Sequence, residues 1–188
     1  MDFNLIINNF FIILQGLDET LILIFLSLSI GFFISIPFAL ARISSIKILS
    51  QSVYYYIFVI RGTPLLVQIY LIYFGLGSIK AVRESFLWIL LKEPFWCGVI
   101  ALVINTVAYT TEIFRGGIQS VTKGQIESCK SLGMNKLTMY HKIVLPVAFR
   151  QAFPAYGNEM ILMIKATSLV SLTTVSYTHL TLPTNREV

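Results

Sequence analysis

Residues of the types that carry out catalysis are few in this chain, and their spacing does not suit catalysis. The 188 residues include two histidines and two cysteines, with no grouping at metal-ligand spacing and no nucleophile placed beside a base. The phosphate-binding pattern GxxxxGK[ST] does not occur either. The sequence therefore predicts a chain that is not an enzyme and that holds no cofactor, ATP or metal ion itself.

Polar and ionisable side chains instead interrupt long apolar segments, where each of them needs a partner. A charge at the centre of a membrane helix costs about 2.5–3.5 kcal/mol on insertion scales. Arg61 and Gln68 lie in one apolar run, and Asn158, Glu159 and Lys165 lie in another. Two interpretations stay open: the groups face a polar path through the protein, or they pair with one another and with backbone carbonyls.

Two local features accompany these charges. Gly62 and Pro64 predict a helix break next to Arg61, whose guanidinium could satisfy the carbonyls that the break leaves free. Glu112 lies one helical turn before Arg115 and is expected to be its structural partner.

The elements that position these groups are predicted to be membrane helices. The chain is 56% hydrophobic and 12% charged, about half the roughly 25% charge that is usual for soluble domains. Apolar runs of about 20 residues are long enough to cross a bilayer. They predict four spans at about residues 20–41, 53–74, 94–112 and 152–172. Asparagines break the apolar pattern of residues 1–17, which are predicted to be an interfacial segment.

The distribution of Lys and Arg indicates the orientation in the membrane. Arg42 and Lys47 follow the first run, and six further cations lie between the third and the fourth. The N-terminus is therefore expected outside, and the loop of about residues 122–146 in the cytoplasm. Cys97 and Cys129 would then lie on opposite sides of the membrane and could not pair.

The predicted cytoplasmic loop carries local signals for two short helices. Thr122 and Gln125 have capping-box spacing, and Gly133 suits the left-handed residue just past a helix end. Asn135 could cap a second helix. This pattern is typical of a docking element, and a solvated loop on the lipid headgroups is the alternative. Two apolar faces are predicted at helical spacing, one of Ile126, Cys129 and Leu132, the other of Leu137, Tyr140, His141 and Val144.

The same loop resembles a known signature. Glu127-Ser128-Cys129, Gly133 and Ile143-x-Leu145-Pro146 have the spacing of the EAA loop, which marks the membrane subunits of binding-protein-dependent ABC importers. Other segments resemble one branch of that family, the polar amino acid permeases of the histidine/glutamine/arginine type, in correct order from about Gly16 to Ser171. These segments are Gly16-Leu17 with Thr20-Leu21, Arg61-Gly62-Thr63-Pro64-Leu65-Leu66-Val67-Gln68, Asn105-x-x-Ala108-Tyr109-x-x-Glu112-Ile113-Phe114-Arg115-Gly116-Gly117-Ile118, Lys123-Gly124-Gln125, Pro154-x-x-Gly157-Asn158-Glu159 and Lys165-x-Thr167-Ser168-Leu169-Val170.

The resemblance implies an all-α polytopic membrane protein with the ABC importer permease fold and a cytoplasmic coupling helix. Residues 18–174 would form the permease domain, with four spans of an expected five, in the bacterial cytoplasmic (inner) membrane. It also implies two sets of functional residues. The residues that couple to the ATPase would be Glu127, Ser128, Cys129, Gly133, Ile143, Leu145 and Pro146, and the residues along the substrate path Asn158, Glu159, Arg61 and Gln68.

The implied activity is ATP-driven import of polar amino acids. The implied partners are a cytoplasmic ABC ATPase dimer, which would bind the ATP and Mg²⁺, a second identical or sister permease subunit, an extracytoplasmic amino-acid-binding protein and the lipid membrane. No nucleic acid is expected. Two alternatives are an importer of the same architecture for another small solute, such as an opine or an organic cation, and a membrane scaffold that does not transport.

The sequence departs from the family pattern most strongly at its end. Val147 and Ala166 replace residues that are usual in the family, which leaves the assignment intact. Residues 175–188 are Thr-rich and polar, and they resemble a translated sequencing adapter. We expect this tail to be non-native and the native last span to be missing.

Overall fold

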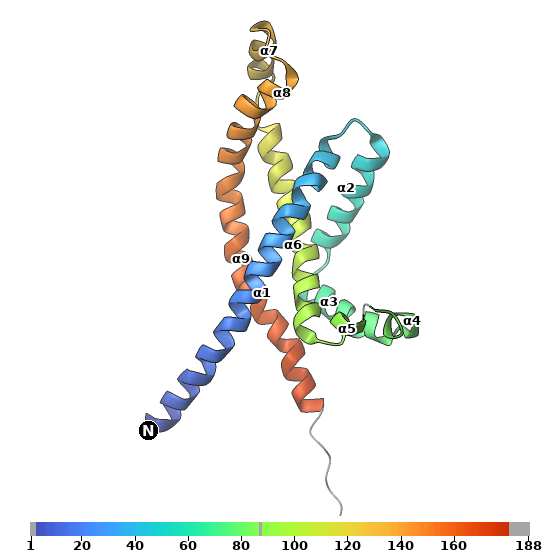
Figure 1. The fold of residues 1–188 in the computed structure, drawn as a ribbon, viewed down its shortest axis with the longest axis vertical. Coiled ribbons are helices and arrows are strands. Elements are labelled where there is room, and N and C mark those ends of the chain that lie inside the picture. Colours follow the sequence, from blue (N-terminus) through green and yellow to red (C-terminus); the bar gives the residue numbers. More distant parts are fainter. Residues whose placement is uncertain (1–2, 87, 181–188) are drawn as a thin grey trace, which may run out of the picture. The chain divides into compact units, whose positions relative to one another are not determined.

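The structure, a computed structural model, describes the backbone of residues 3–86 and 88–180 and the side chains of residues 17–86 and 88–170. Within these ranges the regular elements are all helical. Three helices are long: α1 (Phe3–Ile43), α6 (Pro94–Gln119) and α9 (Leu145–Leu180) (Figure 1). The shorter elements are α2 (Lys47–Gly62), α3 (Leu65–Tyr70), the π-helix η1 (Leu71–Leu76), α4 (Lys80–Arg83), α5 (Trp88–Leu91), α7 (Lys123–Ser131), α8 (Lys136–Met139) and the π-helix η2 (Tyr140–Val144).

Two helices are long and apolar enough to cross a membrane, namely residues 17–43 of α1 and the whole of α6. A third candidate arises if α2 and the α3–η1 segment form one bent span. Helix α9 is not among the candidates found in the described part of the chain. The predicted fourth span therefore stays a prediction, although α9 is 36 residues long.

The structure extends several of the predicted segments. Helix α1 includes residues 3–16, so the predicted interfacial segment continues without a break into the first span. Helix α6 runs to Gln119, beyond the predicted end at residue 112. Residues 175–180 are the end of α9, and the remainder of the expected non-native tail lies outside the described residues, as does any further span.

The helix break beside Arg61 lies where Gly62 and Pro64 predict it, between α2 and α3. Its free carbonyls are not satisfied as the sequence suggested. The Thr63 hydroxyl donates hydrogen bonds to the carbonyls of Val59 and Ile60, at 3.0 and 3.2 Å. The Arg61 guanidinium lies instead over the ring of Tyr109, 4.9 Å from its centroid. The prediction that Arg61 satisfies the break is therefore wrong, because a hydroxyl one turn away reaches these carbonyls with less loss of side-chain freedom.

The chain divides into two compact units. Unit 1 comprises Met1–Ser29, Pro64–Leu102 and Met163–Val188, and unit 2 comprises Ile30–Thr63 and Val103–Leu162. In unit 1, α6 and α9 approach closely at Gly98, where an added Cβ would lie 2.5 Å from Cγ1 of Val170. The Cys97 thiol donates a hydrogen bond to the Leu91 carbonyl at 3.2 Å, which ties α5 to the start of α6.

Unit 2 is held together by close contacts to α6. An added Cβ on Gly31 of α1 would lie 2.6 Å from Cγ2 of Thr106, so α1 and α6 touch where the side chain is absent. A Cβ on Gly117 would lie 2.6 Å from the carbonyl oxygen of Ala148, which brings α9 equally close. Small residues let membrane helices pack backbone to backbone, since lipid provides no hydrophobic drive for their association.

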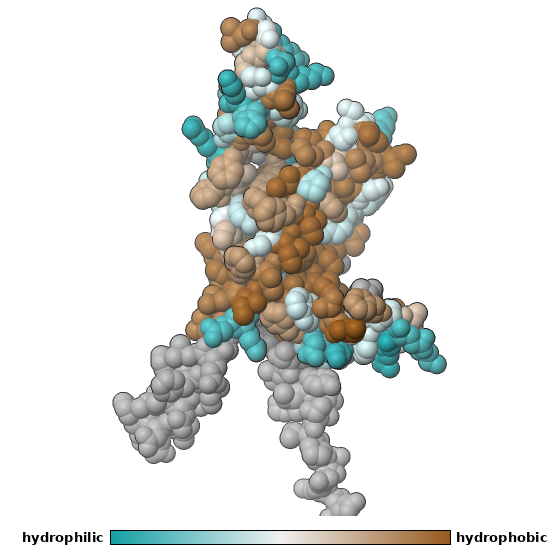
Figure 2. All heavy atoms as spheres, viewed as in Figure 1, coloured by the Kyte–Doolittle hydropathy of each residue, from teal (hydrophilic) through white to brown (hydrophobic). Residues whose placement is uncertain are grey.

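Helix α2 completes unit 2 with an apolar core and one hydrogen bond. Buried Val53 and Ile57 of α2 pack with buried Ala108 of α6, and the Tyr56 hydroxyl donates to the carbonyl of Ile104 at 2.6 Å. Figure 2 shows that hydrophobic residues cover the long helices, and that hydrophilic residues gather on α7 and α8 and also around α4 and α5. The polar end of unit 2 is thus the loop that the sequence places in the cytoplasm.

Candidate functional site

The loop of residues 122–146 begins with a complete capping box. The Thr122 hydroxyl accepts a hydrogen bond from the Gln125 amide at 3.3 Å, and the Gln125 side chain accepts one from the Thr122 amide at 3.1 Å. These two bonds satisfy amides that the first turn of α7 leaves free. The predicted helix start is confirmed.

Helix α7 ends in a Schellman motif at Gly133. Gly133 has a φ of +72°, the left-handed conformation that glycine enters without strain. Its amide donates to the Lys130 carbonyl at 2.9 Å, and the Met134 amide donates to the Cys129 carbonyl at 3.1 Å. This pair of bonds defines the motif, and the predicted role of Gly133 is confirmed.

Asn135 starts the second helix, as predicted, by accepting a hydrogen bond from the Thr138 amide at 2.8 Å. The helix does not stay short. Helix α8, the π-helix η2 and α9 follow one another without a gap, so the chain is helical from Lys136 to Leu180. The second part of the loop is therefore a rigid extension of α9, so that a displacement of α8 would reach α9 through continuous helix.

The apolar core of the loop differs from the predicted faces. Buried Cys129, Met139, Val144 and Val121 form the core. Leu132 and Leu137, which the predicted faces included, are 80% and 82% exposed. The two predicted faces are thus only partly buried: Tyr140 and His141 are also exposed, whereas Ile126 and Val144 pack in the core with Cys129. Two exposed leucines on either side of Gly133 are left at the tip of the loop.

The predicted coupling residues divide between the surface and the interior of this loop. Glu127, Ser128, Leu145 and Pro146 are exposed, as is Gly133. Cys129 is 6% exposed and packs inside the loop, and Ile143 lies half-buried against the same core. The surface set is available to a partner, and the interior set holds the loop in shape.

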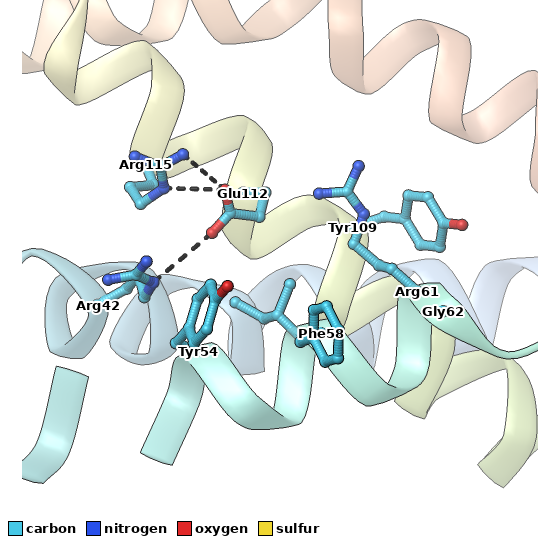
Figure 3. Close-up of a pocket in the computed structure, with 9 residues that line it drawn as sticks. Arg42, Tyr54, Phe58, Arg61, Gly62, Tyr109, Glu112 and Arg115 are labelled. Carbon is cyan, nitrogen blue, oxygen red and sulfur yellow. Dashed lines mark hydrogen bonds and ion pairs between the residues drawn. The ribbon is translucent and has the colours of Figure 1, made fainter. Parts of the chain in front are cut away.

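A second candidate site is a charged groove in unit 2, formed by the end of α1, α2 and α6 (Figure 3). Its volume is about 440 Å³, within the range of small-molecule sites. At one end, Glu112 accepts hydrogen bonds from Nε and Nη2 of Arg115 at 2.9 and 2.6 Å. The predicted pairing of Glu112 with Arg115 is confirmed. At the other end, Arg61 lies over Tyr109.

Arg42 joins the Glu112 end of the groove. Its Nε lies 3.8 Å from Oε1 of Glu112, its Nη1 donates to the Ser50 hydroxyl at 3.0 Å, and its guanidinium lies over the ring of Tyr54. The sequence indicated Arg42 only as a cation on the predicted cytoplasmic side. Helical spacing of Tyr109, Glu112 and Arg115 on one face of α6 was the signal that could have indicated a shared site.

The predicted path residues are only partly brought together. Glu159 in α9 is 6% exposed. Its carboxylate and the Arg61 guanidinium attract each other electrostatically. Asn158 is exposed on the same helix, one residue away. Gln68 is buried in unit 1. Among the described residues, no three His, Cys, Asp or Glu side chains gather into a possible metal site.

Comparison with known proteins agrees with this arrangement. Residues 31–182 match the family described as "Binding-protein-dependent transport system inner membrane component". The chain belongs to this family. It is thus a helical permease component of a transport system, and the all-α membrane fold predicted from the sequence is confirmed.

Individual relatives extend the match over most of the chain. The "Nopaline transport system permease protein NocM" of Agrobacterium fabrum is 50% identical over 93% of this chain and 73% of its own length. The "Histidine/lysine/arginine/ornithine transport system permease protein HisM" of Escherichia coli is 41% identical over 85% of this chain and 68% of its own length. A solved structure described as an "amino acid ABC transporter with histidines" has a TM-score of 0.80 and 40% identity, over 93% of this chain and 77% of the solved chain.

Proposed function

We propose that this chain is the membrane-spanning subunit of an ATP-driven importer for amino acids. The observation that supports this most directly is the likeness, at a TM-score of 0.80, to a chain of an amino acid ABC transporter. In this proposal, ATP and Mg²⁺ bind to a separate cytoplasmic ATPase dimer. An extracytoplasmic protein delivers the amino acid, and a second permease subunit completes the path.

The capped loop is the contact through which the ATPase would act. Its tip presents Leu132 and Leu137, both about four-fifths exposed, to an apolar groove on the partner, and Glu127 is exposed nearby. The capping box, the Schellman turn and the buried core keep the tip from deforming. A displacement of the ATPase would therefore move α9 as a rigid body, because α8, η2 and α9 are continuous.

Glu159 is the best-supported residue along the substrate path. Burial of a carboxylate in a membrane helix costs free energy, and such residues usually have a function. Arg61 supplies an opposite charge, so the pair could receive the ammonium and carboxylate of an amino acid. In the assembled transporter, Glu159→Gln is expected to change uptake affinity, and the preference between arginine and glutamine, while assembly is kept.

Competition uptake with labelled arginine and glutamine in proteoliposomes measures this effect. Glu84→Gln is the matched control, because Glu84 is an exposed carboxylate of unit 1, whereas Glu159 is buried in unit 2. Loss of assembly with an unchanged preference would assign Glu159 a purely structural role.

An opine importer is the second candidate, because a nopaline permease is 50% identical to this chain, whereas an amino acid permease is 41% identical. An opine is an amino acid whose amino group bears a further carboxylated chain, so the two candidates differ in substrate charge and size. The fold and the coupling loop would serve both.

Reconstitution tests the proposed function. The permease is assembled with its ATPase and second permease subunit in liposomes, and labelled amino acids are supplied with the cognate binding protein. We expect uptake that requires both ATP inside and binding protein outside. A chain that assembles with neither partner and moves no solute would refute the proposal and favour a membrane scaffold.

A further inference from the structure

The groove between α2 and α6 carries more positive charge than the surrounding residues neutralise. Arg42, Arg61 and Arg115 line it, and Glu112 is the one carboxylate among the residues that form its wall. Glu112 is engaged by Arg115 at 2.6 Å and shared with Arg42 at 3.8 Å. One carboxylate between two guanidinium groups leaves an excess cation at this end. At the other end, Arg61 has the buried Glu159 carboxylate as an opposite charge, and its own side chain is exposed at the groove.

The hydrogen-bond donors of the groove arginines do not all have an acceptor. Nε of Arg42 is buried and makes no hydrogen bond among the described residues, since its 3.8 Å separation from Glu112 exceeds hydrogen-bond distance. The Arg61 guanidinium lies over the ring of Tyr109, 4.9 Å from its centroid, and the Arg61 side chain is exposed. A buried donor without a hydrogen-bond partner destabilises the protein. A ligand with an anionic oxygen at this point would remove that destabilisation.

The length of the groove suits two anionic groups that are held apart. Tyr54 and Arg61 lie on one face of α2, seven residues apart, which corresponds to about 10 Å along a helix. Arg61 reaches in from one end and Arg42 from the other, with Tyr54 and Phe58 between them and the Tyr109 ring beside Arg61 (Figure 3). The two cationic ends therefore suit a small solute with separate carboxylates joined by an apolar or cationic middle.

We propose that this groove is a binding station for a transported solute that carries more than one carboxylate. One carboxylate meets Arg61 and another meets Arg42, while the aromatic rings contact the connecting chain. Guanidinium groups suit this task because they bind carboxylates through two parallel hydrogen bonds. Arg42 and Arg115 belong to the predicted cytoplasmic side, so the station lies on the release side. The inference rests on the proposed transport function and assigns its substrate to the opine class.

Binding to the assembled permease–ATPase complex, without binding protein, tests the proposal. Arginine and nopaline are a matched pair, because nopaline is arginine with a dicarboxylated chain on its α-amino group. Affinity is read from the rise in the unfolding midpoint with ligand concentration. We expect nopaline to bind the unchanged complex more tightly than arginine. Arg42→Gln should lower the affinity for nopaline by roughly tenfold or more, because one charge-assisted contact is lost. The affinity for arginine should fall much less.

Two further variants protect this test against a folding artefact. Arg61→Gln changes the exposed end of the groove and should also lower the preference for nopaline. Arg150→Gln is the control, because Arg150 is an exposed cation of unit 2 that does not line the groove. Equal binding of both probes to the unchanged complex, or an unchanged preference in both groove variants, would overturn the proposal. Protection by phosphatidylglycerol vesicles that the groove variants abolish, with none by nopaline, would overturn it in favour of a lipid headgroup.

The outcome is separable from that of the proposed function. ATP-dependent uptake of arginine with no discrimination by Arg42 or Arg61 would refute the station and leave the importer standing. Binding of nopaline that depends on both arginines, without any ATP-dependent uptake, would support the station and refute the importer.

Discussion

At the residue scale, Glu112 links helices of unit 2 through its carboxylate. It receives two hydrogen bonds from Arg115 and lies 3.8 Å from Arg42, so it links α6 to the end of α1. Arg42 in turn contacts Ser50 and Tyr54 at the start of α2. Three helices thus meet around one carboxylate, whose loss would leave two guanidinium groups facing each other.

Glu112→Gln is therefore expected to destabilise the protein by about 1–3 kcal/mol, less than a fully buried pair would lose because the side chains are partly exposed. Thermal unfolding in detergent measures the change. Glu93→Gln is the matched control, since Glu93 is exposed and lies in unit 1. Equal unfolding midpoints for the two variants would remove Glu112 from the packing of unit 2.

At the element scale, neighbouring glycines of α6 have opposite surroundings. A Cβ on Gly117 would lie 2.6 Å from the carbonyl oxygen of Ala148 and 3.1 Å from Cβ of Ala152, whereas nothing lies within 4 Å of a Cβ on Gly116. The contact of α6 with α9 therefore requires glycine at one position and tolerates any small residue at the next.

Alanine at these two positions should have effects of opposite sign. Gly117→Ala is expected to cost about 1–3 kcal/mol because the backbone of α9 must move away. Gly116→Ala should be neutral or stabilise by up to about 1 kcal/mol through helix propensity. Denaturant unfolding of both variants in the same detergent measures the two changes in stability. Similar stabilities would mean that α6 and α9 are not in backbone contact.

The turn after α7 gives a second prediction at this scale. Gly133→Val should strain the turn, because a β-branched residue at a φ of +72° is disfavoured. In the reconstituted transporter, we expect ATP hydrolysis to continue without substrate uptake. Gly133→Asn is the control, since asparagine tolerates the left-handed region, and it should retain coupled transport. Normal coupling in the valine variant would exclude the turn from the mechanism.

At the scale of the whole molecule, orientation determines which end meets the ATPase. The basic loop and the polar surface of α7 and α8 coincide (Figure 2), which supports a cytoplasmic position under the positive-inside rule. Asp18 is exposed near the start of the first candidate span, and Leu132 is exposed at the tip of the loop.

Single cysteines at these two positions, in a chain without Cys97 and Cys129, report the orientation. An impermeant maleimide should label Asp18→Cys in intact cells and Leu132→Cys only after permeabilisation. The reverse pattern would place the loop outside and refute its contact with a cytoplasmic ATPase.

The sequence by itself determined the features that depend on near neighbours. The capping box at Thr122, the left-handed Gly133, the cap at Asn135 and the break at Pro64 each depend on atoms within about five residues, and all four lie where they were predicted. The class of protein also followed from the composition, because apolar runs of about 20 residues are typical of transmembrane helices.

Only the tertiary structure decided which distant residues meet. Arg42 and Glu112 are 70 residues apart in the chain, and Arg61 and Tyr109 are 48 apart, yet each pair lines the same groove. Periodicity can place residues on one face of a helix, but it does not show which other helix that face meets, so the sequence left these partners open. The burial of Cys129 and the exposure of Leu132 were decided in the same way, because Cys129 packs with Val121, Met139 and Val144, which are distant in the helix pattern, and Leu132 does not.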